Sequence, residues 1–189
     1  MTAALNDIPP SGEWTTDDLD ALPEDGLRRE LLDGALIMSP SPTRLHQTIA
    51  MRLGVALESS CPPEFDVTQA VEIRISRKRA FIPDVLIARL DAAVHNPSHF
   101  LPYEVMLAVE IVSDGSKAMD RMLKPSVYAE AGIPFYWRVE TDHGIVVHTY
   151  KLDPSNVVYE ETDVFEKHLV VSEPWPIELS LDRLMPRQL

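Results

Sequence analysis

Apolar and polar positions follow two different periods along the chain. In residues 44–59 apolar side chains recur at four-residue steps, which predicts an amphipathic helix lying against a sheet. In residues 67–75 they alternate with polar ones, as in a half-exposed strand. Short runs rich in Val, Ile, Leu or aromatic residues predict buried strands over residues 81–88, 107–112 and 135–139. The pattern therefore predicts strands covered by helices.

Turn and cap residues mark further elements. Asp33-Gly34 between two short apolar stretches predicts a hairpin over residues 29–38. Thr15 and the acids that follow it predict a short helix that ends at Pro23. Pro125 predicts a break, or the start of a fresh helix, inside a helical pattern. The remaining predicted elements are three short strands and a closing helical turn, over residues 144–152, 157–161, 168–171 and 179–185.

Length and composition limit the class of protein. We expect a flexible N-terminus over residues 1–14 and one domain over residues 15–189, because the 189 residues suit a single core. No apolar run approaches the roughly 20 residues of a membrane span, and no signal-peptide pattern is present, so we expect a cytoplasmic protein. The single cysteine, Cys61, excludes an internal disulfide framework and has no nearby histidine to activate it.

The formal net charge of −13 bears on partners. Tight nucleic-acid binding normally leaves a basic footprint, because neutralised phosphates drive the affinity. A nucleic-acid role here would need a local patch, a bound cation or another subunit. The candidate patches are Arg28-Arg29, Arg77-Lys78-Arg79 and Lys117 to Lys124. Solvated turn and helix faces are the simpler interpretation, above all for residues 77–79.

Two carboxylates interrupt the predicted buried strands. Asp84 and Glu110 each stand within or beside an apolar run, where a charge is costly unless a proton, a cation or hydrogen bonds neutralise it. A shared divalent metal is the simplest common partner. Glu30 is either a solvent-facing strand residue or a third acid aimed at the same centre. Lys124, with Lys117 behind it, is the best candidate for a lysine that stabilises charge on a phosphate.

Taken together and in order, these segments resemble the Uma-type endonuclease family, a former domain of unknown function in the PD-(D/E)XK nuclease superfamily. The resemblance covers roughly residues 15–152. It is carried by Glu30-Leu31-Leu32-Asp33-Gly34, Met38-Ser39-Pro40, His46, Pro83-Asp84, Val109-Glu110-Ile111-Val112-Ser113, Asp120-Arg121, Lys124, Tyr128 to Pro134 and Tyr136-Trp137.

The resemblance implies an α+β, restriction-endonuclease-like fold, with a mixed β-sheet flanked by helices in a single domain. It also implies an endonuclease that hydrolyses DNA phosphodiester bonds with Mg²⁺ or Mn²⁺. Asp84, Glu110 and Glu30 would hold the metal, and Lys124 would assist catalysis. An isologous homodimer would suit the cutting of two strands.

Departures from the superfamily motif leave alternatives open. The lysine that usually lies two residues after the second acid is replaced by Val112, so the resemblance assigns its role to Lys124 in the following helix. His46 and Asp120 match positions of the family, and the resemblance implies that they contact the substrate or orient Lys124. Because Pro125 directly follows Lys124, a second hypothesis is a catalytically degenerate nuclease fold that serves as a binding or assembly module. A third is an unrelated acid-rich α+β protein.

Overall fold

The largest sheet among the described residues positions two of the acids that the sequence singles out. The computed structural model describes residues 9, 12–23, 25–39 and 41–187. Strands β8 (Val105–Ile111) and β9 (Phe135–Glu140) pair in parallel, and every other described pair in this sheet is antiparallel. The strand order is β11 (Val158–Phe165), β10 (Val146–Asp153), β9, β8, β6 (Val85–Arg89) and β3 (Phe65–Thr68). The sheet is therefore mixed, as predicted.

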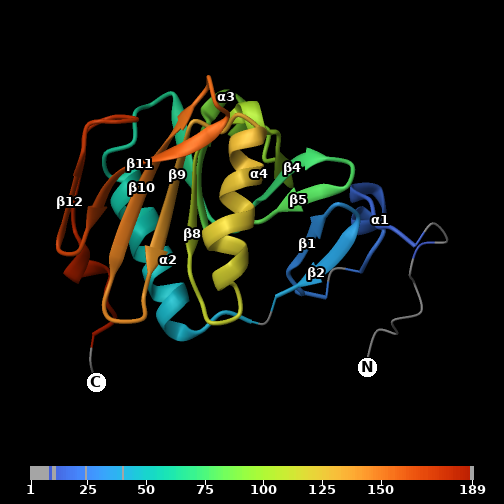
Figure 1. Cartoon of the computed structure of the whole chain (residues 1–189), viewed down its shortest axis with the longest axis horizontal. Coiled ribbons are helices and arrows are strands. Elements are labelled where there is room, and N and C mark those ends of the chain that lie inside the picture. Colours follow the sequence, from blue (N-terminus) through green and yellow to red (C-terminus); the bar gives the residue numbers. More distant parts are fainter. Residues whose placement is uncertain (1–8, 10–11, 24, 40, 188–189) are drawn as a thin grey trace.

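Helices cover both faces of this sheet (Figure 1). Helix α2 (Arg44–Glu58) packs its apolar stripe on one face, in a core shared with Val85, Ile87 and Val109. Helix α4 (Lys124–Glu130) packs on the opposite face, in a second core that contains Leu86. Since successive strand residues point to opposite faces, the central strands are apolar on both sides. This explains why they appear in the sequence as continuous hydrophobic runs.

The N-terminal part forms a second, smaller sheet. Its strand order is β2 (Ala35–Met38), β1 (Arg29–Leu32), β5 (Arg79–Phe81), β4 (Glu72–Ser76) and β7 (His99–Phe100). The predicted hairpin is confirmed, and its turn residues Asp33 and Gly34 have φ angles of 49° and 82°. A side chain at Gly34 would also meet Glu13 Cβ at 3.0 Å. The glycine is therefore required for both conformation and space.

Two single strands predicted from the sequence are each divided between the two sheets. The prediction over residues 67–75 is wrong, because β3 ends at Thr68, Ala70 has a positive φ of 53°, and β4 begins at Glu72 in the smaller sheet. The prediction over residues 81–88 is wrong for a similar reason. Strand β5 ends at Phe81 and β6 starts at Val85 in the larger sheet. Asp84 thus lies where the chain crosses between the sheets.

The shorter elements complete the fold. They are α1 (Thr16–Asp20), α3 (Leu90–Ala93), η1 (Pro102–Glu104), the π-helical turn η2 (Met119–Leu123), β12 (His168–Val171), β13 (Ile177–Ser180) and η3 (Leu181–Leu184). The closing helical turn is confirmed as η3, although a strand precedes it. Most of the predicted flexible terminus, residues 1–8, 10 and 11, lies outside the described residues, and the Trp14 N–H donates to Gly34 O at 2.8 Å. Over the described ranges, the helices are too short or too polar to cross a membrane.

Candidate active site

Asp84 and Glu110 are brought together by strand pairing. Strands β6 and β8 are antiparallel with Val85 opposite Val109, and the same register continued by one residue sets Asp84 opposite Glu110. The Asp84 N–H donates to Val109 O at 3.0 Å, and the Ile111 N–H donates to Asp84 Oδ2 at 2.8 Å. Both acids are buried. Glu110 thus lies on β8 and Asp84 directly before β6, and the strand pairing brings together the two acids that interrupt the apolar runs.

Lys124 joins three acids. Its Nζ lies 3.0 Å from Glu30 Oε1, 3.1 Å from Glu110 Oε2 and 3.6 Å from Asp120 Oδ1. The lysine is only 3% exposed. Burial alone would lower its pKa, but attraction to Glu110, Glu30 and Asp120 outweighs burial and raises it. Lys124 is therefore an ammonium group at neutral pH, and it can neutralise charge but not accept a proton.

Pro125 does not turn Lys124 away from the acids. The wider π-helical turn η2 precedes it, and the Lys124 N–H donates to Met119 O, five residues earlier. Pro125 then stands in the first turn of α4, where a missing N–H costs nothing. The concern that the proline would misdirect the lysine is wrong, because the change from π- to α-helix accommodates the ring.

Glu30 is the third acid of the centre and not a solvent-facing residue. It lies on β1 and is 3% exposed. Its Oε1 accepts the Ile82 N–H at 2.8 Å, besides contacting Lys124. Because residues 82–84 cross between two sheets, side chains satisfy backbone groups that no strand partner reaches. Glu30 therefore ties the smaller sheet to the acids of the larger one.

Asp84 is held by cationic and N–H donors. Arg28 Nη1 donates to Oδ1 at 2.8 Å, and His46 Nε2 lies 3.0 Å from Oδ2. Burial would raise the pKa of Asp84, but the bond to His46, the charges of Arg28 and His46 and the Ile111 N–H together lower it to about 2. Asp84 is thus fully ionised at neutral pH.

This depressed pKa predicts a pH-dependent loss of stability in Asp84→Asn. A folded pKa near 2 against the ordinary 3.8 corresponds to about 2 kcal/mol of unfolding free energy at pH 7. That contribution is present above pH 4 and disappears as the pH falls from about 4 to 2. Urea unfolding of both chains at pH 7 and pH 3 measures it. An equal deficit at the two pH values would contradict the assignment.

Glu110 and Asp120 are the acids with raised pKa values. Burial raises the pKa of Glu110 well above its ordinary value, and Lys124 only partly offsets the effect of burial and of the neighbouring acids. Burial likewise raises the pKa of Asp120. Among the described residues, Asp120 Oδ1 has no hydrogen-bond partner. Glu110 and Asp120 are therefore the acids of this centre in which burial favours the protonated form.

Two residues that sequence reasoning left out of the site belong to it. The Tyr128 hydroxyl donates to Glu110 Oε1 at 2.8 Å, and Arg28 contacts Asp84. Tyr128 lies four residues after Lys124, on the same helix face, so helical periodicity could have found it. Arg28 stands two residues before Glu30, in the candidate patch Arg28-Arg29. Because residues two apart on a strand point to the same face of a sheet, strand periodicity could have placed Arg28 and Glu30 on one face.

The donor chemistry of the centre fits a hard divalent cation. Glu30, Asp84 and Glu110 supply carboxylate oxygens, which Mg²⁺ and Mn²⁺ prefer. Within the described ranges, however, no group of three or more His, Cys, Asp or Glu residues is arranged to hold a metal. Protein donors contact the oxygens of two of these acids: Arg28 and His46 contact Asp84, and Lys124 and Tyr128 contact Glu110.

The surface patches predicted as alternatives for nucleic-acid contact are paired with acids. Arg77 contacts Asp17, and Lys78 contacts Glu13. The other pairs are Arg79 with Asp33 and Glu130, Lys117 with Asp114 and Asp142, and Arg121 with Glu140 and Asp142. These cations form solvated ion-pair faces.

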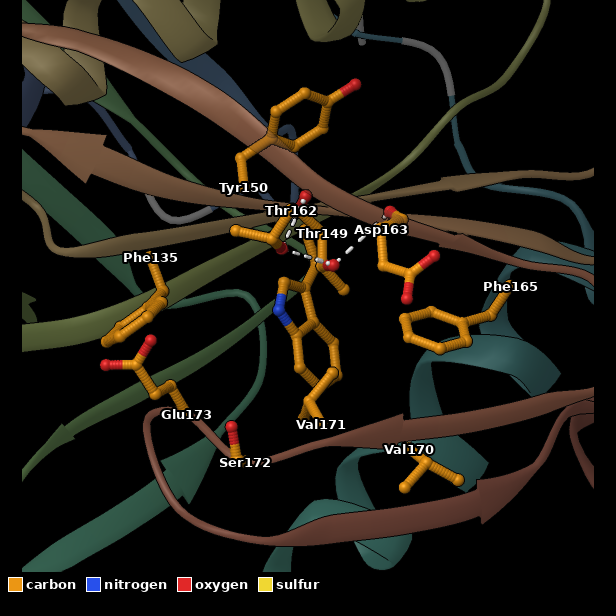
Figure 2. A pocket seen from close by; sticks show the side chains of 11 residues that line it. Phe135, Thr149, Tyr150, Thr162, Asp163, Phe165, Val170, Val171, Ser172 and Glu173 are labelled. Atoms are coloured by element: carbon orange, nitrogen blue, oxygen red, sulfur yellow. Dashed lines mark hydrogen bonds between the residues drawn. The ribbon is translucent and has the colours of Figure 1, made fainter.

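A cavity of about 180 Å³ lies away from this centre (Figure 2). Strands β9, β10 and β11 and the segment around β12 line it. The hydroxyl groups of Thr149 and Thr162 are 2.8 Å apart there, so they satisfy each other. None of the candidate site residues lines this cavity, and it does not contribute to the proposed chemistry.

The single cysteine has the properties of an inert thiol. Partial burial, with the charges of Glu58, Asp66 and Glu64, raises the pKa of Cys61 to about 11. Because only the thiolate reacts, we expect a thiol reagent at pH 8 to label Cys61 roughly a hundredfold more slowly than free cysteine. Rapid labelling in the native state would contradict this. Cys61→Ser should leave any cleavage activity unchanged.

Comparisons with known proteins bear on the fold and the family. No curated protein matches the chain. A solved structure described as a putative nuclease belonging to DUF820, from Anabaena variabilis, is 20% identical and superposes with a TM-score of 0.71, covering 90% of this chain and 96% of its own. At this identity the likeness establishes the fold. The model of the Uma2 family, described as a putative restriction endonuclease, matches residues 16–183. Since that match spans most of the sequence, the chain belongs to the Uma2 family.

Proposed function

We propose that the protein is an endonuclease that hydrolyses DNA phosphodiester bonds with Mg²⁺ or Mn²⁺. The observation that carries the proposal is the position of Lys124, which lies within about one hydrogen-bond length of both Glu30 and Glu110. A buried ammonium beside carboxylates from two sheets suits a phosphodiesterase, even though Val112 occupies the usual lysine position. The family description supports the reaction class.

Each residue has a role that follows from its contacts. Asp84, Glu110 and Glu30 would hold the cation, which when bound neutralises phosphate charge and activates a water molecule. Lys124 keeps its proton and offsets negative charge at the phosphate. Its orientation depends on Asp120, whose main-chain oxygen accepts the Tyr136 hydroxyl at 2.6 Å.

His46 is proposed to contact the substrate. Its Nε2 faces Asp84, whereas its Nδ1 has no partner within the described part of the chain. A neutral ring that donates through Nε2 presents Nδ1 as an acceptor, and a protonated ring presents a second donor. Either form leaves Nδ1 buried and without a hydrogen-bond partner among the described residues, so a substrate contact needs the ring to become more exposed.

The acidic surface bears on the partners. With a net charge of −13, affinity for DNA would depend on the bound cation, on Arg28 and Lys124, or on a second subunit. An isologous homodimer would bring two centres to the two strands, and sedimentation analysis tests it. The single cysteine suits the reducing cytoplasm, where we expect the protein to act.

Cleavage of supercoiled plasmid tests the proposal. The native chain should nick or linearise the plasmid with Mg²⁺ or Mn²⁺ and should be inactive with EDTA. Asp84→Asn should be inactive, whereas the matched control Asp91→Asn, at an exposed position paired with Arg89, should cut normally. Parallel reactions with single-stranded DNA and RNA identify the substrate. A native chain that binds the metal but cuts none of these would overturn the proposal.

The alternative function is a binding or assembly module on a nuclease fold. It is favoured by one observation, that protein donors already cover the oxygens of Asp84 and Glu110. If those donors never leave, no cation enters and no bond is cut. The absence of both metal binding and cleavage in the folded native chain would support this alternative.

A further inference from the structure

We infer that Arg28 is an internal counter-ion that occupies the cation position at Asp84 and leaves when a divalent metal binds, after which its guanidinium is available to a substrate phosphate. This inference rests on the proposed function and deepens it. In this inference, Arg28 first controls the access of the metal to Asp84 and then contacts the phosphate backbone of the nucleic acid.

The contacts of Arg28 overlap those expected of a metal. Nη1 donates to Asp84 Oδ1 at 2.8 Å, and Nη2 lies 3.9 Å from Glu30 Oε1. Nη2 also donates to the carbonyl oxygen of Ile82. A single guanidinium therefore contacts two of the three acids proposed to hold the cation. A metal ion that binds Asp84 Oδ1 would compete with the Arg28 guanidinium for this oxygen.

Exposure distinguishes Arg28 from the other cation of the centre. The Arg28 side chain is 24% exposed, whereas that of Lys124 is 4% exposed and that of Asp84 is 5% exposed. Arg28 is thus on the solvent side of the acid that it contacts. Arg28 directly precedes β1, and its main-chain oxygen accepts the Ser39 N–H at 3.4 Å. Sheet pairing involves the main chain, so the side chain can turn outward without breaking it.

Charge and unsatisfied donors favour the exchange. Four buried acids, Glu30, Asp84, Glu110 and Asp120, face two permanent cations, Arg28 and Lys124. Replacing a guanidinium by a divalent ion brings one more positive charge to an acid-rich centre. The Arg28 Nε–H has no hydrogen-bond partner among the described residues, so not all N–H donors of the guanidinium are satisfied. A released guanidinium suits bidentate binding of phosphate.

Calorimetric titration with Mn²⁺ tests the exchange on the full chain. We expect Arg28→Met to bind Mn²⁺ at least roughly tenfold more tightly than the native chain, because no charge-assisted bond must be broken first. The same variant should cleave plasmid less well at saturating Mn²⁺, since the phosphate contact is lost. The matched control is Arg29→Met. Its native partner is Asp25, outside the centre, so its Mn²⁺ affinity should be unchanged.

Arginine labelling of the native chain provides a second measurement if Arg28→Met does not fold. Phenylglyoxal should modify Arg28 faster with Mn²⁺ than with EDTA, while the rate at Arg29 stays constant, as read by peptide mass spectrometry. Native-like or weaker Mn²⁺ binding by Arg28→Met, or slower labelling of Arg28 with Mn²⁺, would overturn the exchange alone. If neither chain binds Mn²⁺, the metal-dependent function fails as well.

Discussion

Lys124→Met is expected to destabilise the protein by about 3–5 kcal/mol at pH 7.5, which is the cost of removing one partner from a buried charge cluster. The substitution keeps the length of the side chain but leaves Glu30, Glu110 and Asp120 without their shared ammonium group. Urea unfolding followed by circular dichroism measures the free energy. Cleavage should be lost in the same variant.

The pH dependence identifies the cause of this loss. Carboxylates without a cation have raised pKa values, and the pKa values of Glu110 and Asp120 are raised even in the native chain. Protonation removes their cost, so the stability deficit of Lys124→Met should shrink as the pH falls from 7.5 to 5.5. Lys117→Met is the control, because Lys117 makes solvent-accessible ion pairs with Asp114 and Asp142. A pH-independent deficit would indicate lost packing instead of unpaired charge.

Glu110→Gln is expected to abolish cleavage while leaving the fold intact. Metal and charge stabilisation supply several kcal/mol of the barrier reduction, so the rate should fall roughly a thousandfold or more. Stability should stay within about 1 kcal/mol of the native value, or rise, because the raised pKa of Glu110 means that ionising it opposes folding at neutral pH. The amide oxygen can accept from Lys124, and the amide NH₂ can donate to the Tyr128 hydroxyl oxygen.

The exposed position Glu178 on β13 provides the matched control for Glu110→Gln. Glu178→Gln should change neither cleavage nor unfolding. If Glu110→Gln cuts DNA at the native rate, Glu110 does not hold the catalytic cation. If it unfolds several kcal/mol more easily, then the carboxylate supports the fold, and its pKa is lowered by Lys124 more than burial raises it. The two outcomes are read from separate measurements.

Local sequence patterns are enough to predict several elements of the fold and to single out the acids. The Asp33-Gly34 turn specified the first hairpin, the four-residue period specified α2, and apolar runs marked the central strands. Asp84 and Glu110 stood out because a charge inside such a run needs a partner. These features are local, since turn chemistry and periodicity depend on neighbouring residues alone.

The partners of those acids, in contrast, depend on how distant parts of the chain pack together. Arg28 and Asp84 are 56 residues apart in the chain, and their contact depends on the crossing at residues 82–84 that separates two sheets. Likewise, the effect of Pro125 on Lys124 depends on the π-helical turn that precedes the lysine. Helix α4, which follows this turn, packs on the sheet. Periodicity indicates which side chains are buried, but the pairing of buried charges depends on long-range geometry that no local pattern encodes.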